Sequence, residues 1–385
     1  MSGAAKLGGG LEASDSVAVV RRGLPSEHAW IVGGAIRDAA LGEPVVDLDL
    51  AIPEGRERDA ARAIAREAGG YAFPLSERHR TWRAVAPNEA WHADVTALRG
   101  KTIEEDLRAR DFTLNAVAVP LAGGDPVDPL RGIADAEGRV LRAASERAFP
   151  DDPLRLLRAA RLAARHRLEV DPGTIELARA FAQLADEPAG ERQFAELRAI
   201  LCGPEPIRGL ALMDELGITG VVLPELEALR GVAQTANHHL DVHDHTLTVL
   251  ERLLEVEADL PRYAGEAAPA VAELLAEPLS DEVTRGCALR FGALLHDIGK
   301  PATRAMHEGR VTFIGHDSAG AEVVAAICTR LRTSTKLSEH LQGLARHHLR
   351  LGFMVHERPL SRRGIYSYLR ATEPVAADVT LLTAA

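Results

Sequence analysis

The sequence predicts an α+β protein in which a small mixed α/β unit is followed by a long all-helical part. The chain has 385 residues, 46% of them apolar, and single cores seldom exceed roughly 250 to 300 residues, so several domains are expected. Aromatic residues make up only 4%, while Ala, Leu, Arg and Glu abound, which favours helices with aliphatic cores. Strand-like apolar runs occur at 30–32, 46–52 and 93–98, and such runs nearly vanish after residue 151.

These patterns divide the chain into four segments. Residues 1–25 are expected to form a flexible leader rich in Gly and Ala, and residues 26–148 the α/β head. Residues 149–237 form a helical neck and body, and residues 238–385 a helical domain of their own, because eleven of the fifteen histidines follow Asn237. The stretch 255–278, rich in Ala, Glu and Pro, is expected to be a solvated insertion or long loop.

Charge and cysteine content restrict the partners and the cellular setting. A net charge of −11 means that any nucleic-acid contact must come from local arginine clusters rather than from the whole surface. The three cysteines have no paired spacing, so neither a disulfide framework nor a Cys-based zinc site is expected. No apolar run approaches the roughly 20 residues of a membrane span, and a cytoplasmic protein is expected.

A Gly-Gly turn follows the first strand-like run. Gly33 and Gly34 lie between apolar residues 31–32 and a helical stretch, and such a turn presents backbone N–H groups and a helix dipole to phosphate. Arg37 would add a charged fork. The turn alone is equally explained by the backbone freedom of glycine.

Two aspartates about ten residues later favour the functional interpretation. Asp47 and Asp49 lie two apart in an apolar run, so on a strand both carboxylates point to one face. Side-by-side carboxylates repel unless a cation compensates, and the pair suits two Mg²⁺ ions roughly 3.5 to 4 Å apart. Asp94, in the run 93–98, would supply a third carboxylate, or it is an exposed strand residue.

The ordered motifs resemble the class II tRNA nucleotidyltransferase and bacterial poly(A) polymerase family. The resemblance spans roughly residues 28 to 240, and it implies that the body within residues 149–237 binds RNA, with the helices after about Gly203 carrying the tRNA. It is carried by GGAIRD at 33–38, DLD at 47–49, RDFTLNA at 110–116, Asp128-Pro129 with Gly132 and Asp135, DDPLRLLR at 151–158, and Glu191-Arg192 with Glu196-Leu197.

The resemblance implies an activity and roles for the motif residues. CMP, AMP or both would be added to the 3′ end of tRNA from CTP and ATP, with release of pyrophosphate; a poly(A) polymerase is the alternative within the family. Gly33, Gly34 and Arg37 would hold the triphosphate, and Asp47 and Asp49 the Mg²⁺ ions. Three residues would contact the sugar and phosphates of the nucleotide: Arg110, Asp111 and Asn115. Asp111 also fits the start of a helical turn.

A further motif would read the base. Asp152 and Arg155 lie three apart, so on a helix they share a face and offer an acceptor beside donors, which matches the edges of cytosine and adenine. A surface ion pair is the alternative. Asp151 stands where the family usually has Glu. Arg158 would join Arg155 in contacting the nucleotide, and with Arg161 and Arg165 these residues form a basic stripe that would follow RNA phosphates or a solvated helix face.

A second constellation occupies the last third of the chain. It consists of DVHDHT at 241–246, LLHDIGK at 294–300, GHD at 315–317 and RHH at 346–348. An adjacent His-Asp pair beside Leu294 and Leu295 is hard to bury without a metal or a partner. The series resembles the HD superfamily of metal-dependent phosphohydrolases, which implies a second divalent metal with His245, His296 and Asp297 as ligands. His316 and either His347 or His348 would serve a further metal, with His347 favoured. His238 and His239 are expected on a surface or beside RNA.

The HD pattern departs from the family at its end. The closing Asp of that pattern has only Asp378 as a poor candidate, so a truncated domain or a weak metal site is expected. A non-catalytic structural domain is one alternative. Another is that the main activity is HD-type hydrolysis with an RNA-binding front part, and a third is an RNA-binding protein with degenerate sites.

Overall fold

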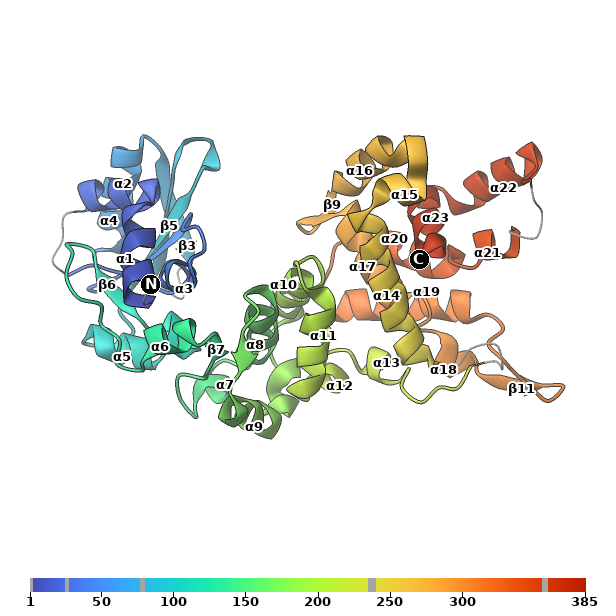
Figure 1. Ribbon diagram of the computed structural model, residues 1–385, viewed down its shortest axis with the longest axis horizontal. Coiled ribbons are helices and arrows are strands. Elements are labelled where there is room, and N and C mark those ends of the chain that lie inside the picture. Colours follow the sequence, from blue (N-terminus) through green and yellow to red (C-terminus); the bar gives the residue numbers. More distant parts are fainter. Residues whose placement is uncertain (1–2, 25–27, 77–79, 235–239, 355–358) are drawn as a thin grey trace. The chain divides into compact units, whose positions relative to one another are not determined.

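The computed structural model describes residues 3–24, 28–76, 80–234, 240–354 and 359–385 (Figure 1). The chain forms two compact units, one of residues 1–155 and 166–178, the other of residues 156–165 and 179–385. Helix α8 (Leu154–Arg165) and helix α9 (Pro172–Ala180) each contribute residues to both units. The expectation of an α+β protein whose main sheet lies in the head is confirmed.

The first unit is built on a six-stranded sheet. The strand order is β3-β4-β5-β2-β1-β6, with β2 and β5 parallel and the other neighbours antiparallel. The strands are β1 (Trp30–Val32), β2 (Leu48–Ile52), β3 (Tyr71–Ser76), β4 (Thr81–Val85), β5 (His92–Ala97) and β6 (Ala118–Pro120). The surrounding helices are α1 (Gly3–Glu12), α2 (Asp15–Gly23), α3 (Gly34–Leu41), α4 (Glu57–Ala68), α5 (Ile103–Arg108), α6 (Gly132–Glu137) and α7 (Ala148–Asp151), with 3-10 turns η1 (Pro87–Glu89) and η2 (Thr113–Asn115).

The two faces of the sheet differ. On one face, alternate strand residues such as Leu48 and Leu50 are buried in the core beneath α1 to α4. On the other face, a smaller cluster of Val32, Ala51 and Ala118 packs on α5. Short strands β7 (Val140–Leu141) and β8 (Glu169–Val170) pair in parallel. The second face is only partly covered, since Asp49 on it is exposed, and it carries the candidate site.

The prediction of a flexible leader over residues 1–25 is wrong for the described part of that segment. Helix α1 packs on α3 and α2 on α4, and Leu7 and Val20 are fully buried. The small residues that suggested flexibility allow close packing instead, because a Cβ on Gly10 would lie 3.1 Å from the Cβ of Ala39.

The second unit is almost entirely helical. After part of α8 it contains η3 (Ala182–Asp186), α10 (Gly190–Leu201), α11 (Pro206–Glu215), α12 (Thr219–Val222) and α13 (Pro224–Glu227). The later part contains α14 (Val242–Ala258), α15 (Leu260–Ala264), η4 (Gly265–Ala267), α16 (Ala268–Ala276), α17 (Arg285–Leu295), α18 (Lys300–Thr303), α19 (His316–Arg330), α20 (Thr335–His347), α21 (Arg350–Met354), α22 (Arg362–Thr372) and α23 (Ala376–Ala384). Two small hairpins interrupt it, β9 (Pro278–Ser280) with β10 (Val283–Thr284) and β11 (Ala305–His307) with β12 (Arg310–Thr312).

Helix α17 is the centre of this second unit. It packs against both α14 and α20 (Figure 1). Nine of its residues, including Leu289 and Leu294, are buried. The expected loop at 255–278 is wrong, since α15, η4 and α16 fill most of it. Pro261 and Pro269 lie in the first turns of α15 and α16, where a missing N–H costs nothing, so these prolines begin helices rather than prevent them.

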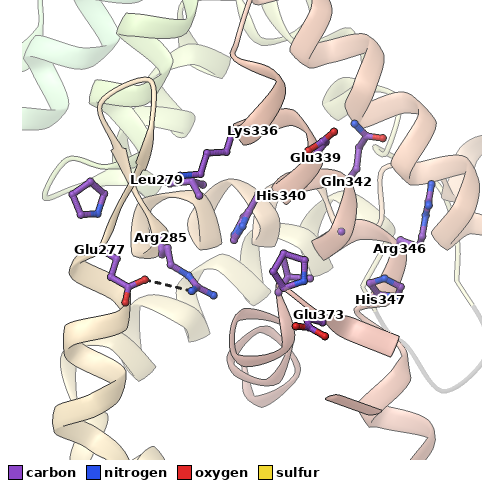
Figure 2. A pocket seen from close by; sticks show the side chains of 14 residues that line it. Glu277, Leu279, Arg285, Lys336, Glu339, His340, Gln342, Arg346, His347 and Glu373 are labelled. Atoms are coloured by element: carbon purple, nitrogen blue, oxygen red, sulfur yellow. Dashed lines mark hydrogen bonds and ion pairs between the residues drawn. The ribbon is translucent and has the colours of Figure 1, made fainter. Parts of the chain in front are cut away.

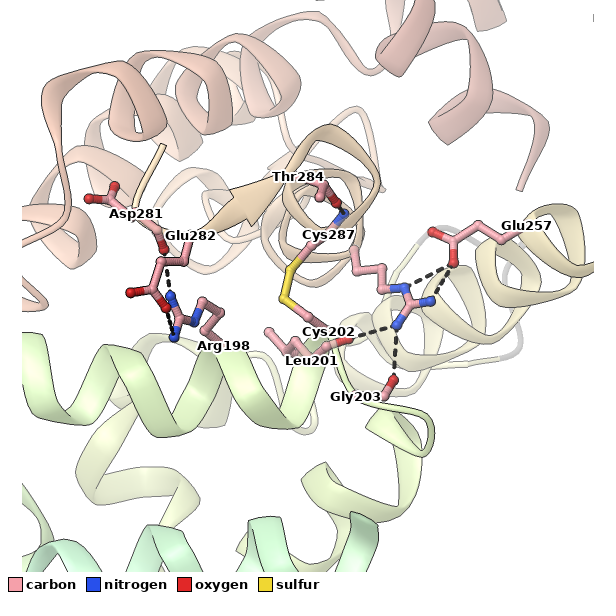
Figure 3. The surroundings of a disulfide bond; sticks show 10 residues. Arg198, Leu201, Cys202, Gly203, Glu257, Asp281, Glu282, Thr284 and Cys287 are labelled. Atoms are coloured by element: carbon pink, nitrogen blue, oxygen red, sulfur yellow. Dashed lines mark hydrogen bonds and ion pairs between the residues drawn. A yellow bond between two sulfur atoms is a disulfide. The ribbon is translucent and has the colours of Figure 1, made fainter. Parts of the chain in front are cut away.

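A disulfide joins two parts of the second unit, contrary to the expectation of unpaired cysteines. Cys202, at the end of α10, is bonded to Cys287 in α17, with the Cα atoms 5.2 Å apart (Figure 3). The two residues are 85 apart in sequence, so spacing gave no signal of the pairing. Arg290 donates to the carbonyl groups of Leu201 and Gly203 beside the bond and to Glu257, which adds polar contacts at the same junction. Among the helices of the described residues, none is long and apolar enough to cross a membrane.

Candidate active site and candidate metal centre

The Gly-Gly turn joins β1 to α3 next to the acidic strand. Gly33 has φ +67°, and a Cβ there would lie 2.7 Å from Oδ2 of Asp49 and 3.2 Å from Nη1 of Arg110. Glycine is therefore required by both conformation and space. The N–H of Gly34, the first residue of α3, donates to Oδ2 of Asp49 at 3.2 Å. The turn thus brings the start of α3, the Arg110 guanidinium and the Asp49 carboxylate next to one another.

The two aspartates lie on the partly open face of the sheet, as their spacing predicted. Leu48 and Leu50 of β2 are buried on the opposite face, whereas Asp47, just before the strand, and Asp49 within it are exposed. Asp47 accepts a hydrogen bond from the N–H of His92 at 2.9 Å and lies 2.8 Å from Nδ1 of the same residue. Two exposed carboxylates on one strand face are the oxygen ligands that Mg²⁺ prefers, so these residues fit the expected metal.

Asp94 is adjacent to Asp49 but is held by a cation. In the parallel pairing of β2 with β5 the two aspartates are directly opposite each other. Arg83 of β4 donates to both oxygens of Asp94, at 2.7 and 2.8 Å. The hydrogen bond with Asp94 raises the pKa of Arg83, and the charges of Asp47 and Asp49 raise it further. Arg83, which the sequence interpretation missed, thus partly neutralises an otherwise acidic face.

Three of the predicted nucleotide-contacting residues form one hydrogen-bonded chain. Buried Arg37 donates from Nη1 to Oδ1 of Asn115 at 3.3 Å, and Nδ2 of Asn115 donates to Oδ1 of Asp111 at 2.9 Å. Asp111 also accepts from the N–H of Phe112, the residue before η2, so it stabilises the turn as well. Arg37 further pairs with Asp38 at 2.7 Å. Because every member is buried, the chain fixes the direction of the Arg37 guanidinium.

Arg110 belongs to a second set of contacts. Its guanidinium donates twice to Oδ2 of buried Asp106, at 2.9 and 2.8 Å, while lying beside Gly33. The other oxygen of Asp106 accepts from the N–H of Arg99. A cation anchored in this way keeps its charge next to the turn without being free to swing away.

The expected Asp152 and Arg155 pair on one helix face is wrong. Helix α7 ends at Asp151, and α8 begins at Leu154, so Asp152 lies between two helices with extended φ −150° and ψ 97°. Pro153 is the reason, because the residue before a proline is pushed out of the helical region. The carboxylate of Asp152 accepts from the N–H of Leu154 at 3.3 Å.

The arginines of α8 have partners of their own. The Arg155 guanidinium donates to the carbonyl groups of Ala109, Arg110 and Ala148. Arg158 is half-buried one turn further along the helix, and Arg161 pairs with Glu196 at 2.5 Å. Asp151 pairs with Arg147, four residues earlier. A fully solvated basic stripe along α8 is therefore contradicted at Arg161.

Four histidines surround one buried aspartate in the second unit. Asp297 follows α17 and is 2% exposed. The Nε2 atoms of His245 and His296 lie 3.5 and 3.0 Å from its Oδ2, and those of His316 and His348 lie 3.3 and 3.5 Å from its Oδ1. The ligand atoms of His245, His296 and Asp297, and of Asp297, His316 and His348, form two groups within 4.8 Å. The predicted ligands of α14, α17 and α19 are thus brought together.

The imidazole rings are oriented as metal ligands usually are. Nδ1 of His296, His316 and His348 each contacts a main-chain carbonyl, at 2.9, 2.7 and 2.7 Å. This contact fixes the Nδ1–H tautomer and leaves a lone pair on Nε2. Nε2 of His316 and Nε2 of His348 are then only 3.2 Å apart, and two lone pairs at that distance repel unless a cation lies between them. The donor set therefore fits a divalent metal.

Charge at this centre is balanced by a residue that the sequence interpretation had given no role. Lys300, in the first turn after Asp297, places Nζ 2.6 Å from its Oδ2 and also donates to Gln234. Burial by itself raises the pKa of Asp297, but the His296, His316 and His348 imidazoles hold that pKa well below its usual value. Burial lowers the pKa of His316, but the nearby Asp297 carboxylate favours the protonated imidazole and raises that pKa above the usual value. A spacing of three residues between Asp297 and Lys300 was the available sequence signal.

His347 is wrong as the last member of the set, and His348 takes its place. Buried positions on α20 follow Leu337, Leu341, Leu344 and Ala345, a spacing that continues to His348 and not to His347. His347 instead lines a cavity of about 520 Å³ with Arg285, Lys336, His340 and Arg346 (Figure 2). Asp378 is not in the histidine cluster either: it is fully buried and pairs with Arg285. His238 and His239 lie outside the described residues.

Comparisons with known proteins follow the same division of the chain. Residues 29–142 match the poly A polymerase head domain, residues 167–229 the probable RNA and SrmB-binding site of polymerase A, and residues 242–380 the HD domain. Among solved structures, the Thermotoga maritima CCA-adding enzyme complexed with tRNA_CCA has a TM-score of 0.67 at 19% identity, covering 98% of this chain and 81% of that one. The fold is therefore shared.

Curated relatives are closer in sequence. The A-adding tRNA nucleotidyltransferase of Deinococcus radiodurans is 38% identical over 331 residues, covering 83% of this chain and 68% of that protein. The CC-adding tRNA nucleotidyltransferase of Thermus thermophilus is 34% identical over 367 residues, covering 93% and 76%. Both relatives exceed 30% identity and are covered over more than two thirds of their length, and this chain therefore belongs to the tRNA nucleotidyltransferase family.

Proposed function

We propose that this protein adds CMP, AMP or both to the 3′ end of tRNA, using CTP and ATP and releasing pyrophosphate. The observation that carries the proposal is the placement of Asp47 and Asp49 on one sheet face beside the Gly33–Gly34 turn. Relatives named A-adding tRNA nucleotidyltransferase, CC-adding tRNA nucleotidyltransferase and multifunctional CCA protein all exceed 30% identity. We propose that the reaction takes place in the cytoplasm.

The reaction is a phosphoryl transfer. The 3′ hydroxyl oxygen of the RNA forms a bond to the α-phosphorus of the nucleotide and releases its proton to water. The bond between the α-phosphorus and the oxygen that bridges it to the β-phosphate breaks, and that oxygen leaves as part of pyrophosphate. Mg²⁺ held by Asp47 and Asp49 would supply charge neutralisation at the attacking and leaving oxygens. Arg37, fixed by Asn115, and Arg110, fixed by Asp106, orient the triphosphate next to the start of α3.

Base selection is proposed for the segment that begins at Asp152. Its carboxylate can accept from the exocyclic amine that cytosine and adenine share, whereas uracil and guanine offer an acceptor at that position. Arg155 and Arg158 remain the proposed donors. Since Arg155 donates to three main-chain carbonyls, using it to read a base requires it to exchange at least one of them.

A poly(A) polymerase is the second candidate, supported by the match of residues 29–142 to a poly A polymerase head domain. For the HD centre we propose hydrolysis of a phosphomonoester or a 2′,3′-cyclic phosphate. Four imidazoles and one carboxylate favour a transition metal such as Ni²⁺, Co²⁺ or Zn²⁺ over Mg²⁺ there.

Single-nucleotide extension assays test these proposals. The protein and Mg²⁺ are incubated with tRNA transcripts ending before CCA, after C and after CC, with each labelled nucleotide added separately. Addition of C, C and A followed by a stop indicates a CCA-adding enzyme, and A added only after CC indicates an A-adding enzyme. Long A tails on any RNA would indicate a poly(A) polymerase. No extension would contradict the transferase proposal.

Two variants separate the two centres. Asp49→Asn is expected to abolish extension and to leave hydrolysis of a model phosphomonoester unchanged, because it removes a proposed Mg²⁺ ligand of the head. His296→Ala is expected to do the reverse. If Asp49→Asn still extends RNA at the wild-type rate, the assignment of the active site is wrong.

A further inference from the structure

An exposed aromatic pair lies on the outermost strand of the head. Tyr71 and Phe73 of β3 are 54% and 36% exposed, although aromatic residues are only 4% of the chain. Their rings are stacked, with centroids 6.0 Å apart and planes 23° from parallel. In a strand, residues two apart share a face, so the pair forms one continuous apolar surface. Exposed aromatic surface of this kind usually marks a contact site.

The pair lies on the same face of the sheet as the proposed metal ligands. Phe73 is paired with Arg83, Arg83 with Asp94, and Asp94 with Asp49, so these four residues form one row across β3, β4, β5 and β2. Directly paired residues project to the same side of a sheet. Helix α4 packs on β3, β4 and β5, with its buried residues in the core on the opposite face. The aromatic surface therefore continues the face that carries Asp49.

The order of strands separates the nucleotide from the aromatic surface. The Gly33–Gly34 turn follows β1, on one side of β2, while β5, β4 and β3 extend from its other side. In phosphoryl transfer the attacking and leaving oxygens are roughly in line, so the acceptor approaches from the side away from the pyrophosphate. If the triphosphate lies at the turn, the acceptor lies across β5, β4 and β3.

We propose that Tyr71 and Phe73 form a stacking surface for unpaired bases of the RNA just upstream of its reacting 3′ end. This proposal rests on the proposed nucleotide addition to RNA. Three strand spacings place Phe73 about 14 Å from Asp49. That distance corresponds to about four nucleotides of a stacked strand at 3.4 Å each, and fewer if the strand is extended. Aromatic side chains bind unpaired bases by stacking, which every base permits.

The same strand is poorly suited to the alternative of pairing with another strand. Pro74 directly follows Phe73 and has no N–H to donate, and the pairing of β3 with β4 shifts between Pro74 and Ser76. Proline and irregular pairing are common ways in which edge strands avoid strand addition. The surface that β3 presents is therefore formed by its side chains, next to Arg83, whose guanidinium is bonded to Asp94 on the same face.

Steady-state kinetics on the full chain test the proposal. Tyr71→Ala, Phe73→Ala and the double variant are compared with Tyr71→Phe and Phe73→Tyr, which keep a ring, and with Tyr263→Ala, an exposed aromatic of the other unit. The KM for the RNA acceptor is expected to rise about 5- to 100-fold in the double variant, as for loss of one stacked base. The KM for the nucleotide should stay unchanged, as should both constants in the ring-keeping variants and in Tyr263→Ala.

RNA acceptors with abasic positions identify the stacked bases. Abasic nucleotides placed two to four positions from the 3′ end should weaken wild-type binding and have little further effect on the double variant, because the same contact is already lost. If the wild-type protein extends RNA and the double variant has an unchanged KM for RNA, the proposal is wrong. An equal rise in the KM for the nucleotide would overturn it as well. Failure of the wild type to extend any RNA would instead contradict the proposed function.

Discussion

The N–H of Gly34 donates a hydrogen bond to Oδ2 of Asp49 at 3.2 Å, which joins the turn after β1 to the acidic strand β2. This hydrogen bond fixes the amide at the start of α3 relative to the carboxylate that is proposed to bind Mg²⁺. Gly33 makes this closeness possible, since any side chain there would meet Asp49. The position of the metal ligand and the position of the phosphate-binding turn are set together.

Replacing Gly33 by alanine should slow nucleotide addition beyond any effect of its lower free energy of unfolding. The change forces a Cβ to 2.7 Å from Asp49 Oδ2 at φ +67°, a strain of about 1–3 kcal/mol. Gly42→Ala is the matched control, because Gly42 ends the same helix at φ +80° with open space around it. Extension assays and denaturant unfolding should show both variants destabilised, and only Gly33→Ala slowed about tenfold or more. Equal activity in the two variants would contradict the role of the turn.

Two adjacent histidines should differ sharply in metal binding. Nε2 of His348 lies 3.5 Å from Asp297, whereas His347 accepts a hydrogen bond from Arg350 at its Nδ1 and lines the separate cavity of Figure 2. Titration with Ni²⁺ or Co²⁺ by calorimetry should show affinity about 10–100-fold weaker or worse in His348→Ala. His347→Ala should bind as the wild type does. The reverse order would mean that α20 is rotated relative to this structure.

Acid should destabilise the protein through His166. This residue is 2% exposed, its Nδ1 contacts Glu43 at 2.9 Å, and within the described part of the chain its Nε2 has no hydrogen-bond partner. Burial lowers the pKa of His166 below its ordinary value of 6.5, and the charge of Arg37 lowers it further, while Glu43 and Asp38 oppose this. Protonation is thus disfavoured in the folded state, so the unfolded state binds more protons. The contribution of His166 is complete above about pH 6.5 and is lost as the pH falls below it.

Denaturant unfolding between pH 7.5 and 5 measures this dependence. One proton contributes a slope of at most about 1.4 kcal/mol per pH unit. His166→Gln should flatten the curve below pH 6.5, and His307→Gln, at an exposed position, should leave it unchanged. A wild-type curve that keeps its slope in His166→Gln would assign the acid sensitivity to other groups.

The bond between Cys202 and Cys287 should make stability depend on redox conditions. It closes a loop of 85 residues, and cross-links of this kind contribute about 2–4 kcal/mol. Reduction, or Cys202→Ala, should lower the free energy of unfolding by that amount, while Cys328→Ala should leave the redox dependence intact. Thiol counting after unfolding without reductant should give one free thiol. Three free thiols in protein purified without reductant would contradict this prediction, because they would show that the bond does not form in the cell.

The motif at 151–158 shows where sequence reasoning fails locally. Helical spacing placed Asp152 and Arg155 on one face, yet Pro153 separates Asp152 from the helix. The rule that a proline disfavours helix at the preceding residue was available and outweighs the spacing. The main-chain carbonyls that accept from Arg155 come from residues 109, 110 and 148, and those partners depend on tertiary structure.

The helical spacing of apolar residues distinguishes His348 from His347, but it does not reveal that the leader is helical. His348 continues the buried positions of α20, so the choice between His347 and His348 was within reach of the sequence. The leader was not, because its glycines and alanines are compatible with disorder as well as with close helix packing. Only the partner surface, Ala39 of α3 beneath Gly10, decides between them.

The sequence alone determined the properties that depend on local spacing: the strand alternation that puts Asp47 and Asp49 on one face, the glycine turn beside them, and the His-Asp pair at the end of a buried helix. Only the tertiary structure decided which distant groups meet. It pairs Arg83 with Asp94 and joins Cys202 to Cys287. It also brings His245 and His296 to one carboxylate oxygen of Asp297, and His316 and His348 to the other. Local patterns fix the direction of a side chain along its own element, but contacts between elements depend on packing that no short stretch of chain encodes.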